Sequence, residues 1–338
     1  MRNGMNIAGV SELVHEVQTE PREAIYRYAA TARWDAGRGL RARNEPAVLG
    51  TVKSPRRFEL AVADERGPAA ADGPTPVRLA LTALASCALT TFVGGGSARG
   101  VTLESLRLVI AADRVRDETT DRLTDLAYAL TVRADTGGVD IAEVLAGMEA
   151  QSPNHRTLVD AQPLTLVLGG ESEPVPAPPA PAARPGTPVS TTVTWSYSTQ
   201  FTAVSDDDPT PLRVDQPKQI AGVDWGPNPQ EYLLMALASC VLGQLARLAA
   251  DRGLPERSWR ARAGGQVDIR GLFNIGDDPI VPVHRLTLDI TPPAEDGGPG
   301  EWRDLAREAV RRSPVVALLT AGHIVKTDLD AGGATAHG

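Results

Sequence analysis

The sequence predicts an α+β protein made of two similar halves. The chain has 338 residues, enough for about two domains. A dense run of prolines between residues 174 and 188 divides it. On each side of that run a Gly-Pro-x-Pro motif, starting at Gly73 and at Gly226, precedes an apolar stretch that ends in Ala-Leu-Ala-Ser-Cys. The interval to Cys87 equals the interval to Cys240, which indicates duplication of a whole domain.

Composition limits the classes of partner. The net charge is -8 and no stretch of the sequence is basic, so we expect no nucleic-acid partner. No N-terminal signal pattern and no uninterrupted apolar run of bilayer length is present, so we expect no membrane partner. Two cysteines are too few for a disulfide-stapled secreted domain, which favours a reduced, cytoplasmic protein.

Proline composition sets the predicted boundaries. Proline lacks an amide donor, so a run this dense fits neither a helix nor a central strand. We therefore expect a first domain at residues 1–170, an extended linker at 171–189 and a second domain at 190–330. The Gly- and Ala-rich residues 331–338 are expected to form a disordered tail.

The order of elements in the first half follows from its periodicity. A short amphipathic helix is expected at residues 10–17, with Ser11 as its N-cap. A buried central helix follows Pro76, because proline suits the first helical turn and the residues after it are apolar on nearly every side. A glycine run at 94–96 is expected to break this helix. The remaining predictions are strands at 26–34, 58–62, 106–111 and 126–132, a helix at 141–150 and a last apolar segment at 164–168.

The second half repeats this order. Alternation of Val193, Trp195 and Tyr197 predicts a half-buried strand within residues 191–204. The second central helix follows Pro229. The remaining predictions are strands at 261–269 and 283–290, a helix at 302–312 and a last apolar segment at 324–329. Mixed helices and antiparallel strands in this order are typical of the α+β class.

One segment carries a family resemblance. Residues 226–240, which read GPNPQEYLLMALASC, resemble the central-helix signature of the OsmC/Ohr superfamily. The opening residues 3–10 with Tyr26-Arg27-Tyr28, and the stretch 312–315, are similar to one branch of it. The resemblance implies an intertwined dimer with antiparallel sheets around two central helices. In this fused chain it implies an intramolecular pseudo-dimer.

The resemblance also implies a chemistry. The peroxide-reducing members use a peroxidatic cysteine on the central helix, a resolving cysteine in a later Cys-Pro element, and an Arg–Glu pair that activates the thiolate. Cys240 with Glu231 matches this pattern better than Cys87, because the first half has Arg78 where the second has the carboxylate. The first site is therefore expected to be degenerate. Arg38 and Arg213 are the candidate arginines by position.

The departures from the family pattern affect turnover. Ser152 and Ser313 stand where the resolving cysteines would be, and a serine cannot form the disulfide that returns a sulfenic acid to a thiol. Turnover would then require an external thiol or pairing of Cys87 with Cys240. Both serines, Trp225 and Tyr232 are candidate pocket residues.

Each candidate also has a structural interpretation. Either cysteine could be a buried, inert thiol, since free cysteine is among the most buried residue types. Glu231 could simply favour a helix N-terminus, and the two serines could cap turns. His155 and His323 have no second ligand at zinc-motif spacing, so no metal is expected. No nucleotide-binding fingerprint is present, so no cofactor is expected.

Three functional hypotheses remain. The first is a thiol-dependent enzyme acting on a small apolar electrophile, most conservatively an organic hydroperoxide with an external thiol as reductant. The same thiolate could instead transfer an acyl or sulfur-containing group. The second is a small-molecule-binding protein that uses an apolar pseudo-dimer pocket. The third is an interaction module that self-associates.

Overall fold

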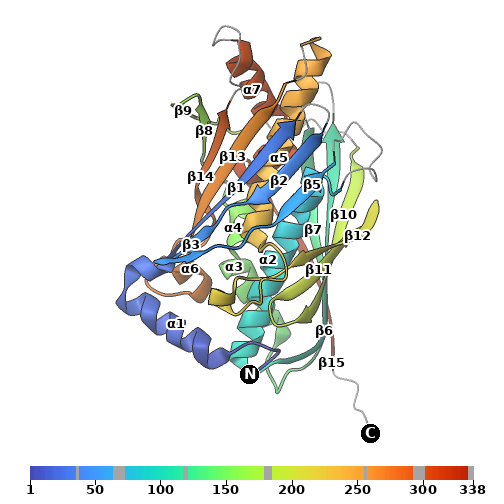
Figure 1. The fold of residues 1–338 in the computed structure, drawn as a ribbon. Coiled ribbons are helices and arrows are strands. Elements are labelled where there is room, and N and C mark those ends of the chain that lie inside the picture. The colour runs from blue at the N-terminus through green and yellow to red at the C-terminus, as the bar shows by residue number, and fades with distance from the viewer. Residues whose placement is uncertain are drawn as a thin grey trace.

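The computed structural model describes residues 1–35, 38–63, 73–116, 121–178, 185–254, 257–291 and 301–333. Two long helices, α2 (Pro76–Arg99) and α5 (Pro229–Asp251), lie between two β-sheets (Figure 1). Each begins with proline, and a side-chain oxygen of the preceding residue, Thr75 or Asn228, caps it. This arrangement confirms the predicted α+β class.

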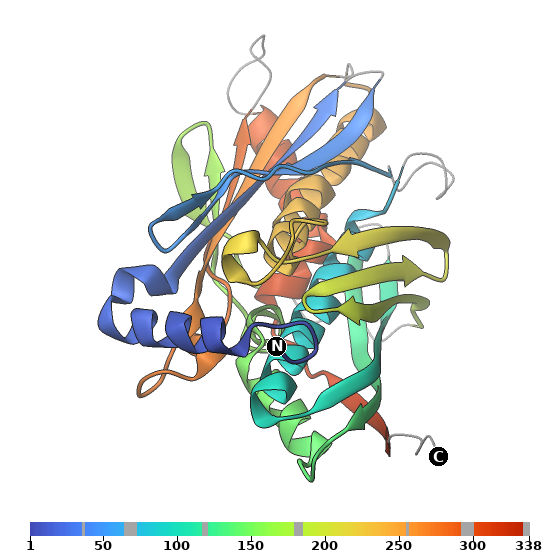
Figure 2. The same ribbon diagram turned by 60° about the horizontal axis from the view of Figure 1, so that its bottom comes forward.

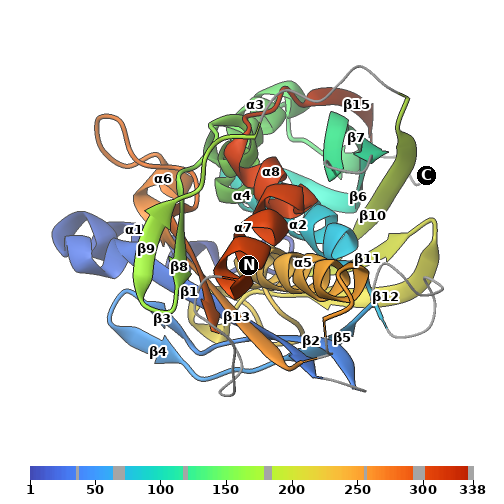
Figure 3. The ribbon, with the colours of Figure 1, turned by 90° about the horizontal axis from the view of Figure 1, so that it is seen from above.

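The larger sheet has nine strands and covers α5, as the view from above shows (Figure 3). Its central pair, β1 with β13, is antiparallel over ten residue pairs, from Ile25 opposite Asp268 to Trp34 opposite Trp259. The strands are β1 (Ile25–Asp35), β2 (Gly39–Asn44), β3 (Ala47–Leu49), β4 (Val52–Ser54), β5 (Glu59–Val62), β8 (Leu164–Leu168), β9 (Glu171–Pro174), β13 (Trp259–Asp268) and β14 (His284–Thr291).

The smaller sheet has six strands in the order β12-β11-β10-β6-β7-β15. It consists of β6 (Thr102–Arg116), β7 (Asp121–Asp135), β10 (Thr187–Tyr197), β11 (Gln200–Ser205), β12 (Asp208–Val214) and β15 (Lys326–Gly333). The sheets are not purely antiparallel as expected, because β14 with β8 and β15 with β7 are parallel pairs.

Strands from both halves of the chain build each sheet. β1 of the first half pairs with β13 of the second, and β10 of the second half pairs with β6 of the first. The halves are therefore intertwined, as the predicted pseudo-dimer requires. The predicted linker 171–189 contributes β9 and the start of β10, while its residues 179–184 lie outside the described part of the chain. Residues 331–333 of the predicted tail belong to β15, and residues 334–338 lie outside the described part.

The first helix differs from its prediction at its start. α1 (Ile7–Thr19) begins before the predicted residue 10. Its N-cap is Asn6, whose side chain accepts from the Gly9 amide. Ser11, the predicted cap, lies inside the helix, where its hydroxyl donates to the Ile7 carbonyl. Asn6 supplies the side-chain acceptor that a helix start needs, so the helix extends back to it.

The first central helix does not break at its glycine run. α2 continues through residues 94–96 and ends at Gly100, whose φ of 101° is the left-handed conformation of a helix C-cap. Burial between neighbouring elements outweighs the cost of about 1 kcal/mol per helical glycine.

The other helices are short and flank the central pair. They are α3 (Ile141–Gln151), α4 (Pro153–Val159), α6 (Ile269–Phe273), α7 (Glu301–Arg312) and α8 (Pro314–Thr320), with 3₁₀ turns η1 (Pro21–Ala24) and η2 (Lys218–Ile220). Two predicted strands end differently. Residues 191–204 form the β10–β11 hairpin with a turn at Ser198, and Ile269 begins α6 because the Asp268 side chain caps that helix.

The central helices make up the middle of the core. By length and mean hydropathy α2 and α5 would pass for membrane spans, although no uninterrupted apolar run was apparent in the sequence. In the structure 89% and 83% of their most apolar windows are buried inside the protein. Phe92 of α2 and Leu245 of α5 are fully buried, which is the burial expected of core helices.

Because both sheets are shared, we predict a single unfolding transition for the two halves. Phe92 is fully buried in the first half of the chain. All tryptophans except Trp34 lie in the second half, so tryptophan fluorescence reports mainly on the second half. Phe92→Ala should lower the free energy of unfolding by about 3–5 kcal/mol. Urea titration followed by tryptophan fluorescence and far-ultraviolet circular dichroism should show one shifted, coincident transition. Val52→Ala, at a half-exposed side chain, is the control and should change little. Two resolved transitions would contradict the shared fold.

Candidate functional site

A cavity of about 850 Å³ lies between α1, the C-terminal part of α2, η2 and α6. Figure 2 shows α1 on the outside of the molecule, where it forms one wall. The lining is mostly apolar and includes Met5, Ile7, Leu13, Tyr26, Leu272 and Phe273. Gly94 and Gly95 of α2 also line it, and their missing side chains leave space beside the helix. Cys87 lies on the wall of this cavity.

The Cys87 sulfur is held by groups from both halves of the chain. It is only 3% exposed. The Asn154 amide, at the start of α4, lies 3.5 Å from Sγ, and the Gln230 side-chain amide, at the start of α5, lies 3.4 Å from it; both donate. The Asn154 side chain donates to the carbonyls of Ala83 and Pro229, so it ties α2 to α5 beside the sulfur. The site is therefore assembled by the pseudo-dimer interface.

Two opposing effects act on the thiol. Burial raises the pKa of Cys87, while the Ser152 hydroxyl, the Asn154 amide and Gln230 lower it. Ser152 lies near the sulfur, yet its buried hydroxyl makes no well-formed hydrogen bond in the described part of the chain. Since burial is the largest effect, the resting group is a thiol whose deprotonation would be helped by two directed N–H donors.

Cys240 has different surroundings. It is 2% exposed, accepts a hydrogen bond from the Ser313 hydroxyl at 3.1 Å, and does not line the cavity. Ser313 also caps α8 through the Val316 amide. The sequence favoured Cys240 as the better site, but the structure places the cavity at Cys87. The positions of α5 that correspond to the two cavity glycines of α2 are occupied by Arg247 and Leu248, which carry long side chains.

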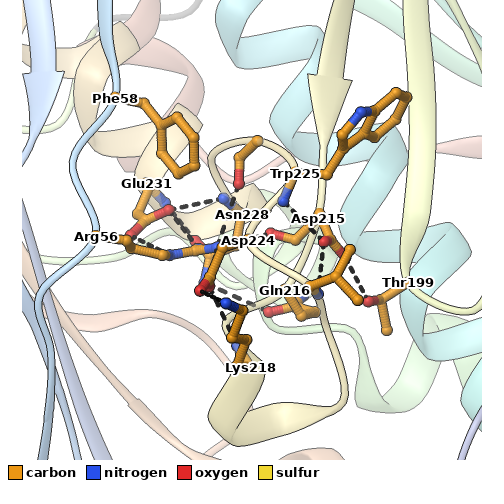
Figure 4. A network of polar contacts seen from close by, with 12 residues as sticks. Arg56, Phe58, Thr199, Asp215, Gln216, Lys218, Asp224, Trp225, Asn228 and Glu231 are labelled. Carbon is orange, nitrogen blue, oxygen red and sulfur yellow. Dashed lines mark hydrogen bonds and ion pairs between the residues drawn. The ribbon is translucent and has the colours of Figure 1, made fainter.

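Glu231 forms a buried network at the start of α5 (Figure 4). Arg56, between β4 and β5, donates to both carboxylate oxygens, at 3.3 and 2.6 Å. Asn44 donates at 2.8 Å and the Asn228 amide at 2.7 Å, which completes a capping box. Burial raises the pKa of Glu231, and Arg56 and these donors oppose that effect. A buried carboxylate with this many donors is a structural anchor.

The loop before α5 is fixed by the same network. Arg56 also donates to the carbonyls of Asp215 and Gly226. The buried Asp215 carboxylate accepts from the Thr199 hydroxyl and from the Trp225 amide. These contacts, visible in Figure 4, hold the start of α5 in the position from which Gln230 reaches Cys87.

Sequence reasoning missed Arg56. The two predicted arginines are not the partners of Glu231: Arg213 stacks on the Trp225 ring at 5.0 Å, and Arg38 is exposed in the β1–β2 hairpin, next to residues 36–37 that lie outside the described part. No local motif marks Arg56, because its partner is 175 residues away.

The two aromatic pocket candidates do not line the cavity. Tyr232 is buried and its hydroxyl donates to the Arg213 carbonyl at 2.8 Å, and Trp225 is half-buried against the Arg213 side chain. The two cysteines, Cys87 and Cys240, are not joined by a disulfide in this structure.

The buried hydrogen-bond network of Glu231 predicts that a single substitution there strongly destabilises the fold. Glu231→Gln removes the buried carboxylate that pairs with Arg56 at 2.6 Å, leaving only the half-buried Asp224 at 3.6 Å, and should lower the free energy of unfolding by about 3–5 kcal/mol. Urea denaturation measures it. Glu171→Gln is the matched control, because Glu171 pairs with Arg303 at the surface with its side chain 72% exposed, and it should cost less than about 1 kcal/mol. Equal effects of the two changes would disprove the anchor.

A buried and a half-buried histidine predict a pH dependence of stability. Burial lowers the pKa of His155, whose ring centroid lies 5.7 Å from that of Tyr128, and of half-buried His323. A lowered pKa means that the unfolded chain binds more protons, so stability is complete above about pH 6.5 and falls as the pH drops through the folded-state values. His155→Gln should flatten the change in Tm between about pH 6.5 and 5 relative to the unchanged chain. An unaltered pH slope would contradict this assignment.

Comparison with known families agrees with the fold. The model of the family described as OsmC-like protein matches residues 69–167 and 222–328, more than half of the chain in two separate stretches. Each stretch contains one central helix and its cysteine. No curated protein matches the chain. The chain therefore belongs to the OsmC-like protein family, as a tandem form in which both copies of the family domain are joined in one polypeptide.

Proposed function

We propose that this chain is a thiol-dependent enzyme whose nucleophile is Cys87 and whose substrate is a small apolar electrophile. The most conservative reaction is the reduction of an organic hydroperoxide by an external thiol. One observation carries the proposal: the Cys87 sulfur lies on the wall of a mostly apolar cavity of about 850 Å³ and accepts from two fixed N–H donors.

The residues present suit each step of this reaction. The Cys87 thiolate would attack the distal peroxide oxygen and break the O–O bond, and the proximal oxygen would leave as an alcohol after taking a proton. Asn154 and Gln230 would stabilise the thiolate before the attack. The product is a sulfenic acid on Cys87. An external thiol would condense with it and release water, and a second would restore Cys87 and leave as a disulfide.

An external reductant is needed because of the neighbours of Cys87. The nearest candidate for an internal resolving group is Ser152, which cannot form a disulfide. Cys240 is engaged with Ser313 and does not share the cavity. Two electrons therefore come from two molecules of a small thiol that enters the same cavity.

The test compares the two cysteines as matched variants. Cys87→Ser should reduce hydroperoxide consumption, measured with cumene hydroperoxide and dithiothreitol, by at least about 100-fold, because the nucleophile is lost. Cys240→Ser should leave most of the activity. Intact-mass spectrometry with peptide mapping after a brief peroxide pulse should show one oxygen, removable by dithiothreitol, on Cys87. Oxygen confined to Cys240, or an active Cys87→Ser variant, would contradict the proposal.

The pH profile provides a second readout of the same site. Since burial raises the pKa of Cys87, the fraction of thiolate and hence the reaction rate should keep rising above about pH 8.

A small-molecule-binding function is the second candidate. The raised pKa of Cys87 favours it, because a neutral thiol is a weak nucleophile. If the protein only binds, an apolar fluorescent probe should bind the unchanged chain and the Cys87→Ser variant equally, and neither should consume peroxide.

Transfer of an acyl or sulfur-containing group would instead label Cys87 covalently with a thioester or a persulfide.

A further inference from the structure

Arginines gather on the outer face of the nine-stranded sheet, away from α5. Arg33 of β1 lies directly opposite Arg41 of β2 on one side and opposite Arg260 of β13 on the other. Two residues along, Thr31 lies between Arg43 and Arg262 in the same way. Strand pairing thus brings together five arginines that come from distant parts of the sequence, between positions 33 and 262.

A hollow of about 580 Å³ lies over this face. Arg33, Arg38, Arg41 and Arg43 line it, together with Thr31 and two carboxylates, Asp35 and Glu59. None of these residues lines the cavity at Cys87, so the two hollows are separate.

Most of this positive charge is not neutralised. Arg41 pairs with Glu59 at 3.4 Å and Arg262 with Glu45 at 3.0 Å. Within the described residues Arg33, Arg38, Arg43 and Arg260 take part in no ion pair. Like charges directly opposite on neighbouring strands destabilise a sheet. Opposed arginines without ion-pair partners are therefore unfavourable for the free chain, and a bound anion would relieve their repulsion.

We propose that this arginine surface binds a small molecule that carries a diphosphate or a longer phosphate chain. Arginine forks hold phosphate oxygens in pairs, and arginine side chains are long enough to reach from two neighbouring rows of the sheet to adjacent phosphate groups. The arginines surround one hollow, and Asp35 and Glu59 interrupt the positive surface, so a compact anion fits better than a long continuous polyanion such as nucleic acid. The sequence did not predict this surface, because only strand pairing brings Arg33 and Arg260 beside Arg41.

Isothermal titration with inorganic pyrophosphate tests the proposal. The full chain should bind pyrophosphate at least about 10-fold more tightly than orthophosphate at the same ionic strength, because only pyrophosphate can engage both arginine rows. The double variant Arg33→Gln with Arg43→Gln should weaken pyrophosphate binding by at least about 10-fold. Arg107→Gln, at an exposed arginine of β6 in the other sheet, is the control and should bind normally. Equal affinity for the two anions, or unchanged binding by the double variant, would overturn the proposal.

Two further measurements separate the alternatives. Pyrophosphate should raise the Tm of the unchanged chain and not that of the double variant, because the anion relieves repulsion between opposed arginines. A short single-stranded oligonucleotide should bind more weakly than pyrophosphate. Tighter binding of the oligonucleotide, with a steep salt dependence, would show a nucleic-acid surface and overturn the small-molecule assignment.

Discussion

The constraint on which this structure depends is the burial of two helices that are apolar on nearly every side. Neither α2 nor α5 can present a broad face to water, so each must be enclosed along most of its length. A single half of the chain does not supply either complete sheet, since β1 pairs with β13 and β6 pairs with β10. Exchange of strands between the halves follows from that need. The site at Cys87 follows in turn, because Gln230 and Asn154 meet the sulfur only where the halves meet.

Ion pairs of opposite polarity join the halves at the two helix starts. At the third position of α5, Glu231 of the second half accepts from Arg56 of the first. At the third position of α2, Arg78 of the first half pairs with Asp208 of the second. A carboxylate suits the positive end of a helix dipole and an arginine does not, so Arg78 gains its stability from Asp208 and the Thr210 carbonyl. The carboxylate missing from the first half is thus replaced by a different interhalf contact.

Because of this difference, a complete motif in one half of the chain does not mean a complete site in that half. Glu231 and Cys240 share one helix, and that made the second half look complete. In the intertwined fold, however, the start of α5 faces the cysteine of the other half: Gln230, next to Glu231, donates to Cys87. The family-like carboxylate therefore supports the site at Cys87, and the cysteine of the half that looked degenerate lies on the cavity, which residues of both halves line.

Sequence reasoning succeeded where the signal was local and failed where it depended on pairing. The central helices, their proline starts and the strand alternation are local patterns, and the duplicated motif made the pseudo-dimer predictable. Arg56 could not be found, because nothing near it marks its contact with Glu231. The glycines at 94 and 95 were misjudged for a related reason: propensity describes an isolated helix, whereas here packing keeps the helix intact and the missing side chains open the cavity.

The arginine surface shows the same limit for charge. Net charge and local runs of charge are properties of the linear sequence, and they argued against a nucleic-acid partner. The pleat of a sheet places every second residue on one face, so arginines of β1 and β13 can join those of β2 in rows that only strand pairing brings together. Opposed arginines weaken the sheet that carries them. The proposed anion would offset this cost, on the face of the sheet opposite the thiol site.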